Sequence, residues 1–145
     1  MHIDSNMNQA NKTILLTGGA GFIGSNLIPL LLDNGFRVHT IDNLSTGKLE
    51  NLKHFKTHAN FTFIEGDIRN QETVDAALQN VNAIIHLAAQ IDVTSSVKDP
   101  LQTHETNVTG TLNLLEEATK HKIKKFIFSS RQHYCKQPLL LAPLG

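Results

Sequence analysis

Short apolar runs alternate along the chain with longer stretches in which apolar residues recur every three or four positions. The short runs predict buried strands, and the longer stretches predict helices. We expect strands over residues 13–17, 37–41, 61–65, 83–87 and 125–129, and helices over residues 22–33, 70–79 and 100–121.

The apolar positions of each predicted helix indicate the face that it buries. They are Phe22, Ile23, Leu27, Leu30 and Leu31 in the first helix, Val74, Ala77 and Leu78 in the second, and Val108, Leu112, Leu115 and Ala118 in the third. Strands that alternate with helices predict an α/β fold with a parallel sheet and helices on both faces. Right-handed crossovers give this doubly wound (Rossmann) sheet the strand order 3-2-1-4-5.

Three glycines, Gly18, Gly21 and Gly24, lie in the turn between the first predicted strand and the first predicted helix. In such a turn one glycine makes the bend, one lets the backbone approach a pyrophosphate, and one lets the helix pack closely on the sheet. The N–H groups at the start of the helix then face the phosphates. The alternative is a tight strand–helix turn that binds no ligand.

An acidic residue, Asp42, follows the second predicted strand. Dinucleotide sites place a carboxylate about 20 residues after the glycine turn, where it binds the adenosine ribose hydroxyls. Because strand, glycines, helix, strand and acid occur in this order, the dinucleotide site is the favoured interpretation. The Asp42 carboxylate also repels a 2′-phosphate, so we expect NAD rather than NADP.

The composition restricts the partners and the location of the chain. Its 13 Lys and Arg residues balance 13 Asp and Glu residues, so we expect no binding to nucleic acid or to an anionic membrane. No apolar run has the length of a membrane span. With 145 residues, 40% of them hydrophobic, the chain has the length of one domain with a substantial core. A single cysteine, Cys135, fits a cytoplasmic location.

Small and polar residues follow each later strand, at the edge where doubly wound sheets bind their ligands. These segments are Asp42-Asn-Leu-Ser-Thr-Gly47, Gly66-Asp-Ile68, His86-Leu-Ala-Ala-Gln90 and Ser129-Ser130, with Asn107-Val-Thr-Gly-Thr111 in the third helix. Together with the glycine turn, they closely resemble the NAD-dependent epimerase/dehydratase family of extended short-chain dehydrogenases, and its UDP-glucose 4-epimerases most of all. The resemblance covers residues 12–130 and implies NAD as the cofactor and a nucleotide sugar as the substrate.

The resemblance also implies roles for individual residues. Phe22 and Ile23 follow the pyrophosphate-binding glycines, and Asn107 steadies the cofactor loop. Ser130 is similar to the catalytic hydroxyl that hydrogen-bonds the sugar oxygen during hydride transfer. The other implied cofactor contacts are Asp42, Asn43, Ser45, Thr46 and Gly47 at the adenosine ribose, Asp67 and Ile68 at the adenine, and Leu87, Ala88, Ala89 and Gln90 on the path to the nicotinamide.

The family pattern stops after Ser130. The family's Tyr-x-x-x-Lys pair, whose tyrosine takes the hydroxyl proton, has no counterpart, because Pro138 stands four residues after Tyr134. We therefore expect a truncated or frameshifted product, incomplete on the C-terminal side of its sheet and inactive alone. The alternative is a non-catalytic dinucleotide-binding module. In both interpretations the last strand is an exposed edge of the sheet, and we expect the chain to self-associate through it.

The expected organisation has three parts. Residues 1–11 are polar and predict a disordered N-terminal segment. Residues 12–130 form the NAD-binding Rossmann domain. Residues 131–145 contain two prolines and a Leu-Leu-Leu run without periodicity, which predicts an irregular tail unrelated to the family.

Several other polar residues favour structural roles. His54 and His58 lie four residues apart without the glutamate of a His-Glu-x-x-His motif, so surface histidines are favoured over a metal site. His86 ends a buried strand, and we expect a hydrogen-bonded structural residue rather than a base. Asp92 and Ser95-Ser96 are expected in a polar loop, with substrate contact as the alternative that the family implies.

Overall fold

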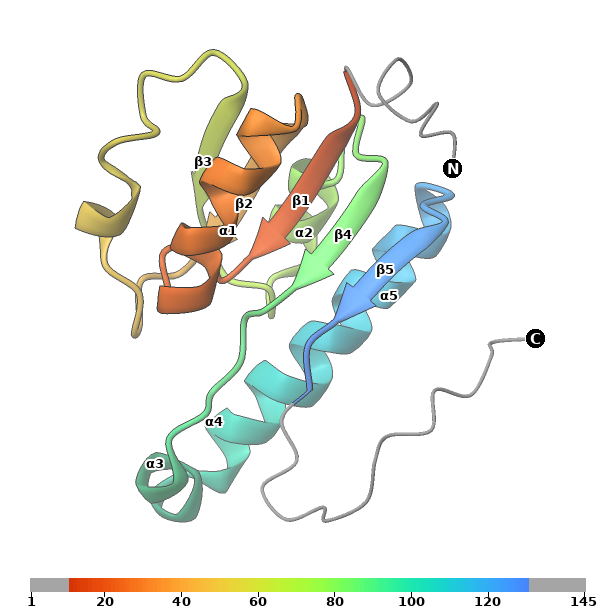
Figure 1. Cartoon of the computed structure of the whole chain (residues 1–145). Coiled ribbons are helices and arrows are strands. Elements are labelled where there is room, and N and C mark those ends of the chain that lie inside the picture. The colour runs from red at the N-terminus through yellow and green to blue at the C-terminus, as the bar shows by residue number, and fades with distance from the viewer. Residues whose placement is uncertain (1–10, 131–145) are drawn as a thin grey trace, which may run out of the picture.

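The computed structural model describes residues 11–130, which form one parallel sheet covered by helices (Figure 1). The sheet has five strands in the order β3-β2-β1-β4-β5. They are β1 (Thr13–Thr17), β2 (Arg37–Asp42), β3 (Phe61–Glu65), β4 (Ala83–His86) and β5 (Lys125–Phe128). The predicted doubly wound order is confirmed, and each strand boundary agrees with the prediction to within one residue.

β1 lies at the centre of the sheet, and all of its residues are buried. Ile14 aligns with Val38 of β2 on one side and with Ala83 of β4 on the other. A parallel strand that is covered on both faces is apolar along its length, which explains the unbroken run Ile14-Leu-Leu16. The parallel register brings the carboxyl ends of all the strands to one edge of the sheet.

Two apolar cores lie on opposite faces of the sheet. One core includes Leu16, Ile28 and Leu52 and is covered by α1 and the 3-10 turn η1. The other includes Leu15 and Leu114 and is covered by α2 and α5 (Figure 1). The helices are α1 (Phe22–Asp33), η1 (Leu49–Leu52), α2 (Gln71–Ala77), α3 (Val93–Lys98), α4 (Pro100–His104), the π-helix η2 (Glu105–Thr109) and α5 (Gly110–Lys120).

The structure confirms the buried face of α2 and corrects that of α1 in part, since the predicted Leu27 and Leu31 are half-buried against the core. Val74, Ala77 and Leu78 are buried as predicted. In α1, however, the buried positions are Gly24, Ile28 and Leu32, because the close approach of Gly24 to the glycine turn fixes the rotation of the helix. The predicted positions of α1 that are exposed instead are Phe22, Ile23 and Leu30.

The predicted helix over residues 100–121 consists of three elements, α4, η2 and α5. The π-turn inserts an extra residue and so rotates the buried face of the helix after it. Of the predicted stripe, only Ala118 is buried; the other buried residues of α5 are Gly110, Leu114 and Glu117. The predicted positions that are exposed instead are Val108, Leu112 and Leu115.

A helix also replaces the polar loop expected after β4. Asp92 is the N-cap of α3, and its Oδ2 accepts hydrogen bonds from Ser95 N and Ser95 Oγ, each at 2.6 Å. Asp92, Ser95 and Ser96 therefore form the start of a short helix, since a capping carboxylate satisfies N–H groups that the first turn leaves free.

Residues 1–10 and 131–145 lie outside the described residues. The expected disordered segment and the expected irregular tail, with Tyr134 and Cys135, fall there almost entirely and stay predictions. Within residues 11–130, no helix combines the length and apolarity that crossing a bilayer requires.

We predict that the 145-residue polypeptide self-associates through β5. This strand is an outer strand of the sheet, and its Ile127 and Phe128 are 58% and 54% exposed. Because a lysine on an edge strand opposes edge-to-edge pairing, Ile127→Lys should shift the polypeptide toward the monomer. Sedimentation velocity over a range of concentrations measures this, with Leu30→Lys on α1 as the control. A wild type that stays monomeric throughout would contradict the prediction.

Candidate functional site

The glycine turn packs so tightly that three of its glycines are required by the fold. Gly18 has φ +73°, and a Cβ on it would lie 2.9 Å from Ala88 N. A Cβ on Gly24 would lie 2.4 Å from Gly18 O. The third is Gly19, which sequence reasoning missed and where a Cβ would lie 1.7 Å from Thr40 Oγ1. All three distances are shorter than van der Waals contact.

Gly21 differs from these three glycines. Its φ of −76° and ψ of 176° are open to any residue. The nearest atom to a Cβ there would be Gly18 O at 3.3 Å, a tight contact that does not reach the overlap seen at the other three glycines. Gly21 is therefore the least crowded glycine of the turn, and its missing side chain leaves the start of α1 open beside the exposed Phe22 and Ile23. Close approach of a phosphate to a helix N-terminus needs such an opening.

Asp42 ties the glycine turn to the loop that follows β2. Its side chain is almost fully buried; Oδ2 accepts from Ala20 N at 2.9 Å and Oδ1 from Leu44 N at 2.8 Å. Ala20 O in turn accepts from Lys48 N at 3.1 Å and from Asn51 Nδ2 at 2.8 Å. Because each carboxylate oxygen accepts more than one hydrogen bond, Asp42 keeps acceptor capacity for a ligand hydroxyl.

The rest of the loop after β2 lies next to Asp42 and remains accessible. Ser45 N donates to Asn43 Oδ1 at 3.0 Å, which turns the loop back on itself. Ser45 and Thr46 are exposed, and a Cβ on Gly47 would lie 3.1 Å from Asp42 Oδ1. The predicted ribose contacts are thus brought together by the structure, and their contact with a ribose stays a prediction.

Asp67, at the end of β3, is held by Arg69 and Asn43. Arg69 Nε and Nη2 donate to Asp67 Oδ1 and Oδ2 at 3.0 and 2.8 Å, and Asn43 Nδ2 donates to Oδ2 at 3.0 Å. The hydrogen bond from Arg69 is the main reason that the pKa of Asp67 lies at about 2, below its usual 3.8. Arg69 Nη1 also pairs with Glu105 Oε2 at 3.5 Å.

An open pocket of about 550 Å³ lies beside this ion pair, with lining residues Asp67, Arg69, Asn70, Glu105 and Thr109. The predicted contact of Ile68 with the adenine would require an accessible side chain, and that of Ile68 is not accessible. It is buried in the core and packs against Gly110, where a Cβ would lie 2.6 Å from Ile68 Cγ1. The side chain of Ile68 is therefore not available to a ligand.

We predict that Asp67→Asn destabilises the fold in a pH-dependent way. The folded pKa of Asp67 is about 2, lower than the usual 3.8, so its charge stabilises the fold above pH 3.8 and this contribution is lost as the pH falls toward 2. Asp67→Asn should lower the free energy of unfolding by about 1 kcal/mol at pH 7, since the pair is partly solvent-exposed. The loss should be smaller at pH 2.5. Urea denaturation at both pH values measures it, with Asp33→Asn as the control, and an equal loss at both would contradict the prediction.

The segment after β4 is fixed at both ends by side chains. Thr17 Oγ1 accepts from Leu87 N at 3.1 Å and from Ala88 N at 3.0 Å. Asn107 Oδ1 accepts from Gln90 N at 2.7 Å, and Asn107 Nδ2 donates to Gln90 O at 3.0 Å. Asn107 thus contacts the loop that it was expected to steady, with Ala89 exposed between the two anchors. A cofactor contact by this loop stays a prediction.

His86 and Ser130 lie near the same loop. His86 is buried and its two ring nitrogens contact Thr17 and Thr111, which confirms the expected structural role. Burial lowers the pKa of His86 to about 4, so the imidazole is neutral at pH 7. Ser130 is exposed just beyond β5, the strand that pairs with β4. The structure therefore places the Ser130 hydroxyl at the edge that also carries the segment after β4.

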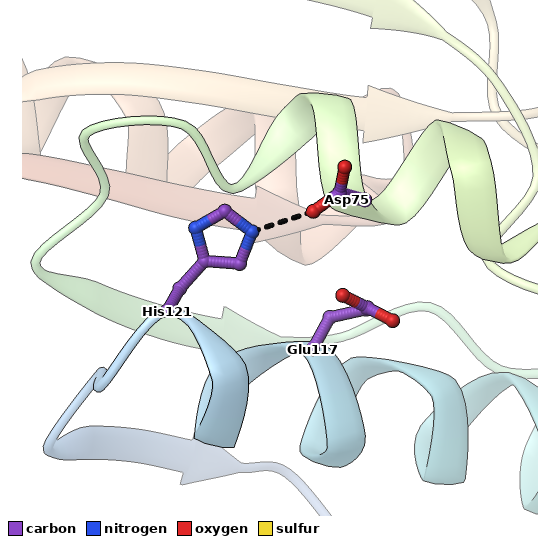
Figure 2. Close-up of side chains that lie close together, drawn as sticks. All are labelled: Asp75, Glu117 and His121. Carbon is purple, nitrogen blue, oxygen red and sulfur yellow. Dashed lines mark hydrogen bonds and ion pairs between the residues drawn. The ribbon is translucent and has the colours of Figure 1, made fainter.

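One cluster of potential metal ligands lies within residues 11–130, where α2 packs on α5 (Figure 2). His121 Nε2 and Asp75 Oδ1 are 2.7 Å apart. Glu117 Oε1 accepts from Lys120 Nζ at 2.5 Å and from Gln71 Nε2 at 2.7 Å. Each group thus has a protein partner, and the Lys120 cation already neutralises the buried carboxylate. His54 and His58 are not part of this cluster.

Comparison with known proteins gives consistent matches. Residues 15–137 match a family model described as GDP-mannose 4,6 dehydratase. A putative UDP-glucose 4-epimerase of Methanocaldococcus jannaschii is 40% identical over 118 residues, which are 81% of this chain and 37% of the relative.

Solved structures agree with these matches. The UDP-glucose 4-epimerase of Thermotoga maritima, solved with UDP-glucose, has a TM-score of 0.75 and 44% identity over 81% of this chain and 37% of its own. The UDP-glucose 4-epimerase of Thermus thermophilus, solved with NAD, has a TM-score of 0.70 and 40% identity over 79% of this chain and 36% of its own. The chain therefore spans little more than a third of the length of these relatives.

The family match covers most of the chain, and the matched residues include the segments at the carboxyl edge that carried the resemblance in the sequence. The chain belongs to the NAD-dependent epimerase/dehydratase family.

Proposed function

We propose that this chain is the NAD-binding part of a nucleotide-sugar epimerase or dehydratase similar to UDP-glucose 4-epimerase. The observation that carries the proposal is the contrast among the glycines of the turn. A Cβ on Gly18, Gly19 or Gly24 would overlap a neighbouring atom at 2.9 Å or less, whereas a Cβ on Gly21 would make one tight contact at 3.3 Å. Its missing side chain keeps open a position at which a pyrophosphate can meet the N–H groups of α1.

The other predicted contacts extend from this position along the carboxyl edge. The adenosine ribose lies against Asp42 and the loop of Asn43, Ser45, Thr46 and Gly47. The adenine occupies the pocket beside Asp67 and the main chain of Ile68. The nicotinamide half follows the segment from Leu87 to Gln90, which Thr17 and Asn107 hold in place.

In this arrangement the bound NAD supplies a hydride acceptor for transient oxidation of the sugar. The residues of the chain bind and orient. The N–H groups at the start of α1 neutralise phosphate charge, and Ser130 offers a hydroxyl that hydrogen-bonds the sugar oxygen at the end of β5. His86 takes no proton in this scheme, because it is buried and both ring nitrogens are engaged by threonines.

A second candidate function is a dinucleotide-binding module without catalysis. It is favoured by the sequence after Ser130, where Tyr134 has Pro138 in place of a lysine four residues later. Both candidates require dinucleotide binding, and they differ in turnover.

The test of the shared part is cofactor selectivity. We expect NAD to bind roughly tenfold or more tightly than NADP, because a 2′-phosphate would face the Asp42 carboxylate. Asp42→Ala should weaken NAD binding, since it removes both the ribose acceptor and the clamp on Ala20 N and Leu44 N. Calorimetry with NAD and NADP measures both effects, and Asp33→Ala serves as the control. Equal or tighter binding of NADP by the wild type would overturn the assignment.

A further inference from the structure

A continuous chain of hydrogen bonds joins the two anchors of the segment after β4. His86 Nδ1 lies 2.6 Å from Thr17 Oγ1, and His86 Nε2 lies 2.9 Å from Thr111 Oγ1. Thr111 Oγ1 donates to Asn107 O at 2.7 Å. Thr17 is the anchor at Leu87 and Ala88, and Asn107 is the anchor at Gln90. His86 therefore stands between the two.

The protons in this chain have one consistent arrangement. Thr17 Oγ1 already accepts hydrogen bonds from Leu87 N and Ala88 N, which use its two lone pairs. Its own proton is therefore donated to His86 Nδ1, which must be unprotonated. The neutral imidazole then carries its proton on Nε2 and donates it to Thr111 Oγ1. A proton on Nδ1 would face a hydroxyl with no free acceptor.

The surroundings of His86 keep this arrangement. The apolar rings of Phe126 and Phe128 lie beside the imidazole, with centroids at 6.1 and 5.5 Å. Burial among these groups lowers the pKa of His86 to about 4. The imidazole therefore keeps its neutral form across the physiological range of pH.

The π-helix η2 completes the second anchor. Asn107 lies within η2, and Thr111 follows it one turn later in α5. A π-turn is rare and is found mostly at functional sites, where it changes the direction of side chains. Here Asn107 makes both of its side-chain amide hydrogen bonds to the main chain of Gln90. The helix distortion and the His86 contact thus meet at the same loop.

We propose that His86 is a positioning residue: as the Nε2–H imidazole it couples Thr17 to Thr111, so that both anchors hold the main chain from Leu87 to Gln90 in the shape that receives the nicotinamide half of the cofactor. The part that concerns nicotinamide rests on the proposed function. The coupling of the two anchors does not.

The experiment compares His86→Gln and Thr111→Val with two controls, Thr111→Ser, which keeps the hydroxyl, and His54→Gln, which alters an exposed histidine. Amide hydrogen exchange without ligand reports on Leu87, Ala88 and Gln90. Calorimetry with NAD and with ADP-ribose, which lacks only the nicotinamide, reports on the site. We expect His86→Gln and Thr111→Val to speed exchange at the three amides and to weaken NAD at least fivefold more than ADP-ribose, and both controls to behave as the wild type.

Several results would overturn the inference. Equal weakening of NAD and ADP-ribose would reduce His86 to a structural residue, and so would unchanged exchange at the three amides. A proton on Nδ1 in imidazole ¹⁵N spectra of the wild type near pH 7 would contradict the hydrogen-bond arrangement. If His86→Gln fails to fold, Thr111→Val decides the result. A wild type that binds no NAD would instead refute the proposed function, and the exchange rates would then decide the coupling alone.

Discussion

Gly21→Val is expected to abolish most NAD binding with a smaller effect on the fold than Gly24→Val, which is expected to damage the fold itself. Gly21 has backbone angles that valine adopts, and its Cβ would have one neighbour, Gly18 O at 3.3 Å. The branched side chain would then project into the opening at the start of α1. Losing two charge-assisted hydrogen bonds to phosphate costs about 3 kcal/mol, or roughly 100-fold in affinity.

Gly24 has no such freedom. A Cβ there would lie 2.4 Å from Gly18 O and 2.6 Å from Gly19 Cα, both main-chain atoms that have no rotamer to change. Overpacking of this kind costs about 3 kcal/mol or more, a large fraction of the stability of a small domain. Thermal melts followed by circular dichroism separate the two variants, and calorimetry with NAD measures the binding. Leu30→Val, an exposed position on α1, is the control for β-branching in the helix.

Two outcomes would contradict this contrast. If Gly21→Val binds NAD within threefold of the wild type, the opening at α1 is not the pyrophosphate site. If Gly24→Val melts at the temperature of the wild type, the packing described for the turn is wrong.

The 145-residue polypeptide is expected to show no turnover of UDP-glucose, UDP-galactose or dTDP-glucose even when it binds NAD. Ser130 contributes a hydroxyl but no base. Tyr134 has no lysine four residues on to lower its pKa, and buried His86 is not available to a substrate. Loss of a general base alone reduces a rate by about 10²–10⁴-fold.

A coupled assay at high protein concentration measures this turnover against a full-length relative as the positive control. Ser130→Ala shows which activity belongs to the polypeptide rather than to a contaminating enzyme. Turnover that disappears in Ser130→Ala would contradict the prediction. It would also exclude the non-catalytic module as the function of the chain.

The sheet was predictable because its signals are local. The run Ile14-Leu-Leu16 identifies a strand covered on both faces, and the alternation of strands with helices fixes the parallel order. Asp42 and Asp67 were found for the same reason, since Asp42 ends β2 and Asp67 lies two residues after β3.

Other features depend on contacts between distant residues and leave no local pattern. The rotation of α1 follows from the backbone contact of Gly24, and the apolar Phe22 and Ile23 therefore suggest the wrong face. No characteristic residue pattern marks the π-turn at Asn107. This turn rotates α5, so that Glu117 belongs to its buried face. The hydrogen bond from Ala20 N to the Asp42 carboxylate joins residues 22 positions apart, so it is visible only in the folded structure.

The central strand β1 pairs with β2 and β4, and β4 is synthesised well after β1 and β2. Thr13 N donates a hydrogen bond to Asn82 Oδ1, and Asn82 lies 69 residues further along the chain, directly before β4. A ribosome that adds about 5–20 residues per second delivers β4 roughly 3–14 s after β1. Throughout that interval β1, whose residues are all buried in the folded protein, has an open edge to which other chains can pair. The rate of translation between these two strands therefore sets how long this edge stays open in each nascent chain.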